Sequence, residues 1–343
     1  MSWERVRLPG DLTPLTLTPM GDRLLVGARV ESAQPAPKLL LLDHGDWSAV
    51  PLRPDSFYAD RARWRSVVTD GHRIFAFGDA PGGAHSNPRW TTWAGSLDGL
   101  REYPQFFETF GGWGAGGLTG MTMYQGEPLI IGSWSSESSG LDIAEWTADG
   151  NDWSRRDSTG TALANSKHAL NVIRAVGQDP DGIALAGAVV KLADGQVTLQ
   201  PAMWRRTTLE PEWVRLDLPA VAAGEATGVR CSGGSCVATG YVDDRLAIWS
   251  VQDGAVKPAD DLPMVNVGSD SVALVGATGA DGSFVMTTSA GHSLVLTLGP
   301  EGWVRTQGPA GTAVASAYLA GRTYVITTTP DGGAALWAGR LGS

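Results

Sequence analysis

The sequence predicts an all-β protein, a seven-bladed β-propeller with four-stranded antiparallel blades whose last blade is closed by the N-terminal strand. Two observations support this prediction. Short apolar segments recur about every 50 residues, and tryptophans recur at matched positions after them. Short strands between Gly-, Asp- and Pro-rich turns are typical of antiparallel meanders. Four such strands in a unit of this length form one propeller blade.

The first landmark of each unit is an apolar run that ends on a small residue, and we expect it to be the second strand. Such runs end at Gly27, Gly78, Gly132, Gly187, Gly240, Thr288 and Thr328. Their spacing of 40 to 55 residues defines seven units. The 45 glycines and 20 prolines are spread along the whole chain, as many tight turns would require.

Tryptophan marks the two outer strands of the units. One set lies in the expected third strands, at Trp93, Trp146, Trp204, Trp249 and Trp337, with Thr297 near this position in the unit skipped between Trp249 and Trp337. A second set opens the expected fourth strands, at Trp3, Trp47, Trp153, Trp213 and Trp303. Blades diverge outwards, so large rings are expected to fill the outer gaps and small residues the crowded centre.

Ring closure follows from the same spacing. The stretch from Trp303 through the C-terminus to Trp3 is one blade long. Residues 2–9 are therefore expected to supply the outer strand of the last blade, beside residues 334–341. This pairing would remove the open edge of the ring and make residues 1–343 a single domain.

Charge narrows the range of partners. Lys and Arg number 26 and Asp and Glu 36, which gives a net charge of −10. Such a surface argues against nucleic-acid binding and against adsorption to anionic membranes. The apolar runs are too short for membrane insertion, and the N-terminus lacks the apolar region of a secretory signal. We expect a cytoplasmic protein, and the excess of arginine over lysine suggests a bacterial source; the oligomeric state stays open.

Two cysteines, Cys231 and Cys236, flank a Ser-Gly-Gly-Ser segment that resembles a hairpin turn. A disulfide across such a turn is geometrically feasible. The alternative is a pair of reduced thiols, which a cytoplasmic location favours. Two cysteines alone do not make a zinc site.

Several expected third-to-fourth turns carry an Asp-Gly pattern. The segment TADGNDW at residues 147–153 is the fullest example, and DHGDW at 43–47 and GPEGW at 299–303 are shorter versions. These units resemble the Asp-box (BNR) branch of β-propellers, whose Asp boxes are structural. That branch includes sialidases, and VRLP at 6–9 resembles their first arginine motif. Because the same register recurs in WVRLDLP at 213–219, this segment is expected at the rim, which argues against a classical sialidase.

A functional site is expected at the channel mouth where the connections enter the first strands. Acid–base chemistry there would fall to His168 with Glu108 and Glu225, because a histidine is a natural proton shuttle. The expected ligand-binding residues are Tyr58, Arg61, Arg63, Trp113, Lys167, Arg230 and Asp270. The aromatic, Gly-rich loop 106–117 would be either a stacking wall for a ligand or a plug over the channel.

Two functions follow from this arrangement. The first is a binding module for a small ligand or a partner protein at the channel mouth, because no catalytic signature is present. The second is an enzyme of lyase, hydrolase or cyclase type that uses the same mouth, by analogy of fold. No cofactor is expected, and the histidines show no metal-ligand spacing. An axial Ca²⁺ held by carbonyl and carboxylate oxygens stays an alternative.

Overall fold

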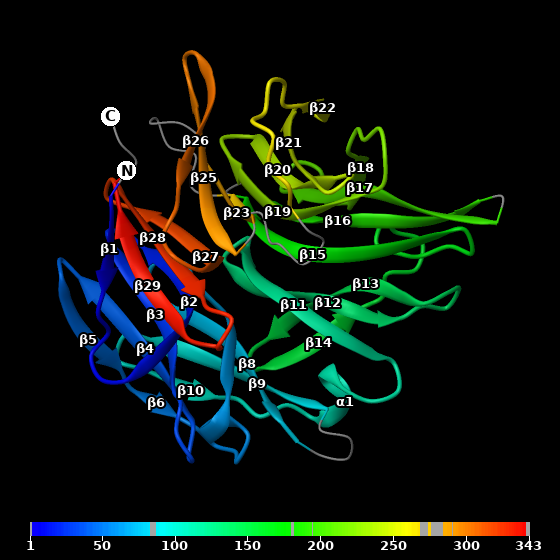
Figure 1. Ribbon diagram of the computed structural model, residues 1–343. Helices are drawn as coiled ribbons and strands as arrows, with labels where there is room; N and C mark the ends of the chain where they lie inside the picture. Colours follow the sequence, from blue (N-terminus) through cyan, green and yellow to red (C-terminus); the bar gives the residue numbers. More distant parts are fainter. Residues whose placement is uncertain are drawn as a thin grey trace.

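The computed structural model describes residues 2–82, 87–179, 182–193, 195–267, 274–275, 284–289 and 291–340. Seven antiparallel sheets stand around a common centre, which confirms the predicted seven-bladed propeller (Figure 1). Each sheet is a meander whose first strand lies innermost. Blade 7 is built from both ends of the chain.

The strands of each blade follow in order from the centre outwards. Blades 1 to 3 contain β2 (Leu12–Met20), β3 (Arg23–Val30), β4 (Ala36–Asp43) and β5 (Asp46–Val50); β7 (Arg63–Thr69), β8 (Ile74–Pro81), β9 (Pro88–Ser96) and β10 (Gly99–Glu102); and β11 (Ala115–Tyr124), β12 (Glu127–Ser135), β13 (Leu141–Asp149) and β14 (Asp152–Arg156). Blades 4 and 5 contain β15 (Ala169–Asp179), β16 (Gly182–Ala193), β17 (Gln196–Thr207) and β18 (Val214–Asp217); and β19 (Gly224–Ser232), β20 (Ser235–Val242), β21 (Arg245–Gln252) and β22 (Ala255–Pro258). Blades 6 and 7 contain β23 (Leu274–Val275), β24 (Phe284–Ser289), β25 (His292–Gly299) and β26 (Gly302–Gln307); and β27 (Thr312–Leu319), β28 (Arg322–Thr328), β29 (Ala334–Gly339) and β1 (Trp3–Val6).

The ring closes as the spacing predicted. Strand β1 pairs antiparallel with β29, and Trp3 lies opposite Gly339, so the two ends of the chain lie side by side (Figure 1). Blade 2 departs from the predicted four strands. A short β6 (Leu52–Arg53) pairs in parallel with β10, and the Leu100 N–H donates to the Pro51 carbonyl. This pairing covers the outer edge of the blade.

The glycines that end the apolar runs have a specific structural role. In blades 1 to 5 each lies in the second strand, opposite a β-bulge of the innermost strand. A Cβ on Gly187 would lie 1.9 Å from the Val172 carbonyl oxygen, and one on Gly240 would lie 1.9 Å from the Glu225 carbonyl oxygen. The recurring glycine therefore marks the bulge, where the two backbones approach too closely for a side chain.

The third-strand tryptophans lie between blades, as expected, and several also anchor the incoming connection. The indole N–H of Trp146 donates to the Thr109 carbonyl at 2.8 Å, and that of Trp249 donates to the Pro219 carbonyl at 2.8 Å. Both side chains are buried. Each ring thus packs in the outer gap while its single polar group satisfies a loop carbonyl.

Cys231 and Cys236 lie opposite each other in the β19–β20 hairpin and form a disulfide. Of the two predicted alternatives, the structure therefore contains the disulfide and not the pair of reduced thiols. Disulfides persist mainly in oxidising compartments, so the cytoplasmic location that favoured reduced thiols stays a prediction.

The helices are η1 (Ala59–Arg61) and α1 (Phe107–Phe110), of three and four residues. Neither could cross a bilayer, and the described part of the chain offers no other helical span.

Candidate functional site

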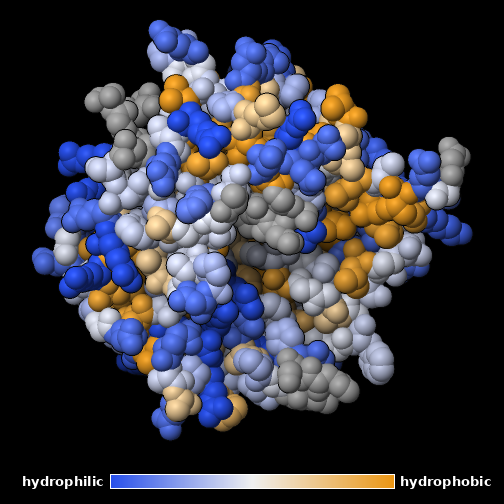
Figure 2. Space-filling view, viewed as in Figure 1, coloured by the Kyte–Doolittle hydropathy of each residue, from blue (hydrophilic) through white to orange (hydrophobic). Residues whose placement is uncertain are grey.

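The innermost strands surround a cavity of about 480 Å³ at the centre of the ring. Figure 2 shows a central hollow on one face of the molecule, with hydrophilic and hydrophobic residues interspersed around it. The described lining comes from six blades. It consists of residues 17–19, 66–69, 121–123, 176–177, 229–232 and 316–317. A cavity of this size is in the range that holds small ligands.

Arg230 is the one charged residue in the described lining of this axial cavity. It lies on β19 opposite Val237, and burial lowers the pKa of its guanidinium. No described residue forms an ion pair or hydrogen bond with it. A cation that is partly removed from water without an anionic partner is costly. The cavity is therefore electrostatically suited to an anion.

The axial cavity lies at the other end of the channel from the predicted mouth, where the connections enter the first strands. Its lining comes from the second halves of the innermost strands, such as β2 near Met20 and β7 near Thr69. Glu225 lies at the opposite end of β19 from Arg230. Five residues of strand separate them by about 16 Å, so the structure does not bring these two predicted residues together.

Glu225 is instead held by Arg174, which is not among the site residues predicted from the sequence. The Arg174 Nε donates to the Glu225 Oε1 at 2.8 Å and joins the innermost strands of blades 4 and 5. The Glu225 side chain is 3% exposed. Tyr241 lies opposite it on β20, and burial and the Glu225 carboxylate raise the pKa of the Tyr241 phenol. These groups form a compact acid–phenol–guanidinium cluster.

The signal for Arg174 is present in the repeat. It is the bulged residue of β15, thirteen residues before the glycine that marks the bulge, Gly187. Bulges redirect one side chain out of the alternating pattern and are frequent at functional sites. Counting back from the glycine would have identified the position.

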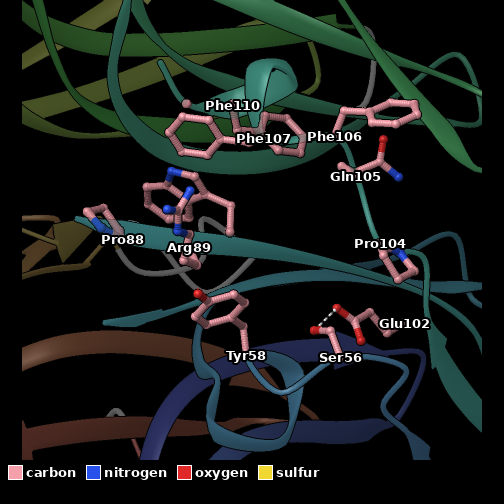
Figure 3. A pocket seen from close by; sticks show the side chains of 12 residues that line it. Ser56, Tyr58, Pro88, Arg89, Glu102, Pro104, Gln105, Phe106, Phe107 and Phe110 are labelled. Carbon is pink, nitrogen blue, oxygen red and sulfur yellow. Dashed lines mark hydrogen bonds between the residues drawn. The ribbon is translucent and has the colours of Figure 1, made fainter. Parts of the chain in front are cut away.

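Tyr58, Glu108 and Trp113 lie at the outer part of the ring, between blades 2 and 3. Tyr58 lines a pocket of about 170 Å³ (Figure 3). Glu108 and Trp113 line an adjoining groove of about 870 Å³. Loop 106–117 forms part of the lining of both hollows. Its predicted role at the channel mouth, as a stacking wall or a plug, stays a prediction.

The other predicted residues lie apart from these hollows. Arg61 stacks over the Phe57 ring at 4.0 Å, and Arg63 is exposed at the start of β7. Lys167 and His168 are exposed on the turn before β15. No carboxylate of the described residues lies within 4.0 Å of the His168 ring nitrogens. Asp270 lies outside the described residues.

No cluster of three or more His, Cys, Asp or Glu side chains suited to a metal ion occurs in the portion of the chain that the structure describes. The described lining of the axial cavity offers a guanidinium and hydroxyl groups rather than carboxylates. The predicted alternative of an axial Ca²⁺ held by carbonyl and carboxylate oxygens stays a prediction.

No protein-family model and no curated protein matches the sequence. Among solved structures, the β-propeller domain of the Trilobed protease from Pyrococcus furiosus aligns with a TM-score of 0.58 at 8% identity, over 97% of this chain and 96% of that one. That propeller is described as having an open velcro topology. In the present chain β1 and β29 close the ring instead.

Two enzymes of known structure also align with this chain. A puromycin-hydrolyzing peptidase from Mycobacterium tuberculosis aligns with a TM-score of 0.59 at 10% identity, and the chain spans 97% of its own length but 51% of the peptidase. A mutant α-L-arabinofuranosidase from Fusarium graminearum, in complex with an iminosugar inhibitor, aligns with a TM-score of 0.53 at 12% identity, over 96% and 93% of the two chains. At such identities the likeness shows the fold alone: a seven-bladed β-propeller whose structural neighbours include hydrolases.

Proposed function

We propose that this protein is a ligand-binding β-propeller that holds a small anionic molecule in its axial cavity. The observation that supports this proposal is the isolation of Arg230, the single charge among the described lining residues. A ligand carboxylate or phosphate would supply the counter-charge that the described chain does not, and a guanidinium binds such groups through paired hydrogen bonds. Hydroxyls of residues such as Ser232 and Ser316 line the same space.

Calorimetric titration with inorganic phosphate and with citrate tests this proposal. We expect at least one anion to bind the wild type, and Arg230→Met to weaken that binding about tenfold or more, because a charged hydrogen bond is lost. Arg305→Met is the matched control, since Arg305 is exposed on β26 of blade 6. The proposal fails if neither anion binds, or if Arg230→Met and Arg305→Met bind as the wild type does.

A second candidate function is an enzyme that acts at the other end of the channel. The observation that favours it is the buried Glu225 carboxylate, which Arg174 orients and Tyr241 flanks. Such a carboxylate could serve as a base or nucleophile, with Arg174 as its positioning residue. The arabinofuranosidase neighbour makes a glycoside a reasonable first substrate.

Hydrolysis of 4-nitrophenyl α-L-arabinofuranoside provides the test of this second candidate. Turnover by the wild type, and its loss in Glu225→Gln with the fold retained, would support the enzyme. Absence of turnover, or full activity in Glu225→Gln, would leave the binding module as the better proposal. The relation to the Asp-box branch stays a prediction. Its quoted turns do join third to fourth strands, as in β13–β14.

A further inference from the structure

Beyond the axial cavity, the gap between blades 2 and 3 contains a second arginine with which no described residue forms an ion pair. Arg89 lies on β9 and lines the pocket of about 170 Å³. Its guanidinium is 4.2 Å from the centroid of the Phe107 ring and 5.9 Å from that of the Tyr58 ring. Figure 3 shows the guanidinium between these two rings, which come from opposite sides of the pocket. Its Nε is buried and has no hydrogen-bond partner among the residues that the structure describes.

Two other polar side chains of this pocket, Glu102 and Gln105, are already engaged. The Glu102 carboxylate accepts hydrogen bonds from the Asp55 N–H and the Ser56 hydroxyl, both at 2.7 Å (Figure 3 shows the second). The Gln105 amide donates to the Tyr103 and Asn151 carbonyls and accepts from the Trp153 N–H. The Arg89 Nε, in contrast, is a buried donor for which the described residues provide no acceptor, and an unmet buried donor is costly.

An aromatic groove continues from this pocket. The two hollows share Pro88, Trp90, Phe107, Phe110 and Gly111. The groove, of about 870 Å³, adds the indole rings of Trp113 and Trp134.

Trp113 is fully exposed, although large aromatic side chains are usually well buried in folded proteins. The loop that holds it is anchored at Phe110, which is buried against Trp146. An exposed ring on an anchored loop beside a groove indicates a binding surface.

We propose that these two hollows form one site for a small aromatic carboxylate, with the carboxylate at Arg89 and the ring system in the groove. The position of the cation sets this orientation, because Arg89 lines the pocket and not the groove, whereas Glu108 lines the groove. The Glu102 carboxylate also lines the pocket, but it already accepts hydrogen bonds from the Asp55 N–H and the Ser56 hydroxyl. Rings stack on Trp113 and Phe107. The protein has a net charge of −10, so its general field does not attract anions, and binding depends on this local cation.

The test uses 2-naphthoate, titrated by calorimetry and by quenching of tryptophan fluorescence. The wild type is expected to bind it, and Arg89→Met and Trp113→Ala are each expected to weaken binding about tenfold or more. Arg305→Met is expected to bind as the wild type does. Loss of binding in Arg230→Met with binding retained in Arg89→Met would instead assign 2-naphthoate to the axial cavity, so failure of this proposal does not entail failure of the other.

A second comparison does not depend on any variant. The neutral analogue 2-naphthalenemethanol has the same rings without the charge, and the wild type should bind it about tenfold more weakly than 2-naphthoate. The proposal is overturned if 2-naphthoate does not bind, if the two compounds bind equally, or if Arg230→Met alone abolishes binding. If Arg89→Met does not fold, the ratio of the two affinities in the wild type decides.

Discussion

Two regions of this propeller each contain a partly or fully buried arginine, but a described carboxylate pairs with the arginine in only one of them. Between blades 3 and 4, the Arg206 Nη1 lies 2.9 Å from the Glu145 Oε2, and the Trp213 indole donates to the same oxygen at 3.1 Å. The rings of Tyr124 and Trp213 flank the guanidinium at 4.5 and 4.8 Å. In the axial cavity, Arg230 has no such partner among the described residues.

The presence or absence of a counter-charge distinguishes arginines that link blades from arginines that can bind a ligand. A buried ion pair with flanking rings is complete within the protein, and removing one member leaves an uncompensated charge. An arginine beside an open cavity can acquire its counter-charge from a ligand in solution. The counter-charge around each arginine, rather than its burial alone, therefore indicates its role.

The largest expected effect comes from breaking the pair between blades 3 and 4. Arg206→Met leaves the Glu145 side chain, 7% exposed, with the Trp213 indole and the more distant Arg156 at 3.7 Å. We expect the free energy of unfolding to fall by about 3–5 kcal/mol. Urea denaturation monitored by circular dichroism measures the change.

The double variant Glu145→Met/Arg206→Met is the control for this prediction. It removes both charges, so it should recover most of the stability that the single variant loses. A single variant as stable as the wild type would show that Arg206 is not a structural link, and the contrast with Arg230 would no longer hold.

Much of the fold could be predicted from the sequence because the repeat encodes it redundantly. Apolar runs mark all seven units, and the third-strand and fourth-strand tryptophans each mark five of them independently. Strand β6 was missed because a two-residue strand has no periodicity of its own, and the main-chain bond between Pro51 and Leu100 fixes it. Arg174 was missed because a bulge breaks the alternation of side chains on which strand analysis relies.

The candidate site was less predictable, for a geometric reason. The positions of loops along a sequence show which residues share an end of the ring, but not which hollow they line. Tyr58 and Trp113 were both expected at the channel mouth, yet they line the gap between blades 2 and 3. Arg89 follows the connection into the third strand of blade 2 and lies on β9. Its importance depends on the absence of a counter-charge, which only three-dimensional contacts reveal.

The exposed ion pair between Asp70 and Arg73 is expected to contribute less to stability than the buried pair between blades 3 and 4. Asp70 lies in the hairpin after β7. Partial burial raises the pKa of its carboxyl, but the N–H groups of His72 and Arg73 and the Arg73 guanidinium outweigh this and lower it to about 2. The resulting stabilisation is present above the ordinary pKa of 3.8 and is lost as the pH falls through about 2.

Because this pair is exposed, we expect Asp70→Asn to cost at most about 1 kcal/mol at pH 6. The difference in urea midpoint between wild type and Asp70→Asn should shrink between pH 4 and pH 2. A difference that is constant with pH would mean that the charge of Asp70 does not contribute.

The smallest expected effect on stability comes from Arg230 itself. Arg230→Met removes a guanidinium whose pKa is lowered by burial and for which no described residue supplies a counter-charge. Without ligand, the free energy of unfolding should therefore stay within about 0.5 kcal/mol of the wild type or rise. A saturating anion should reverse the order, because at 100 times its Kd it stabilises only the protein that binds it, by about 2.7 kcal/mol. Urea denaturation with and without the anion measures both states. A loss in the ligand-free state as large as that of Arg206→Met would show that Arg230 is held by the fold, and that the two regions do not differ in kind.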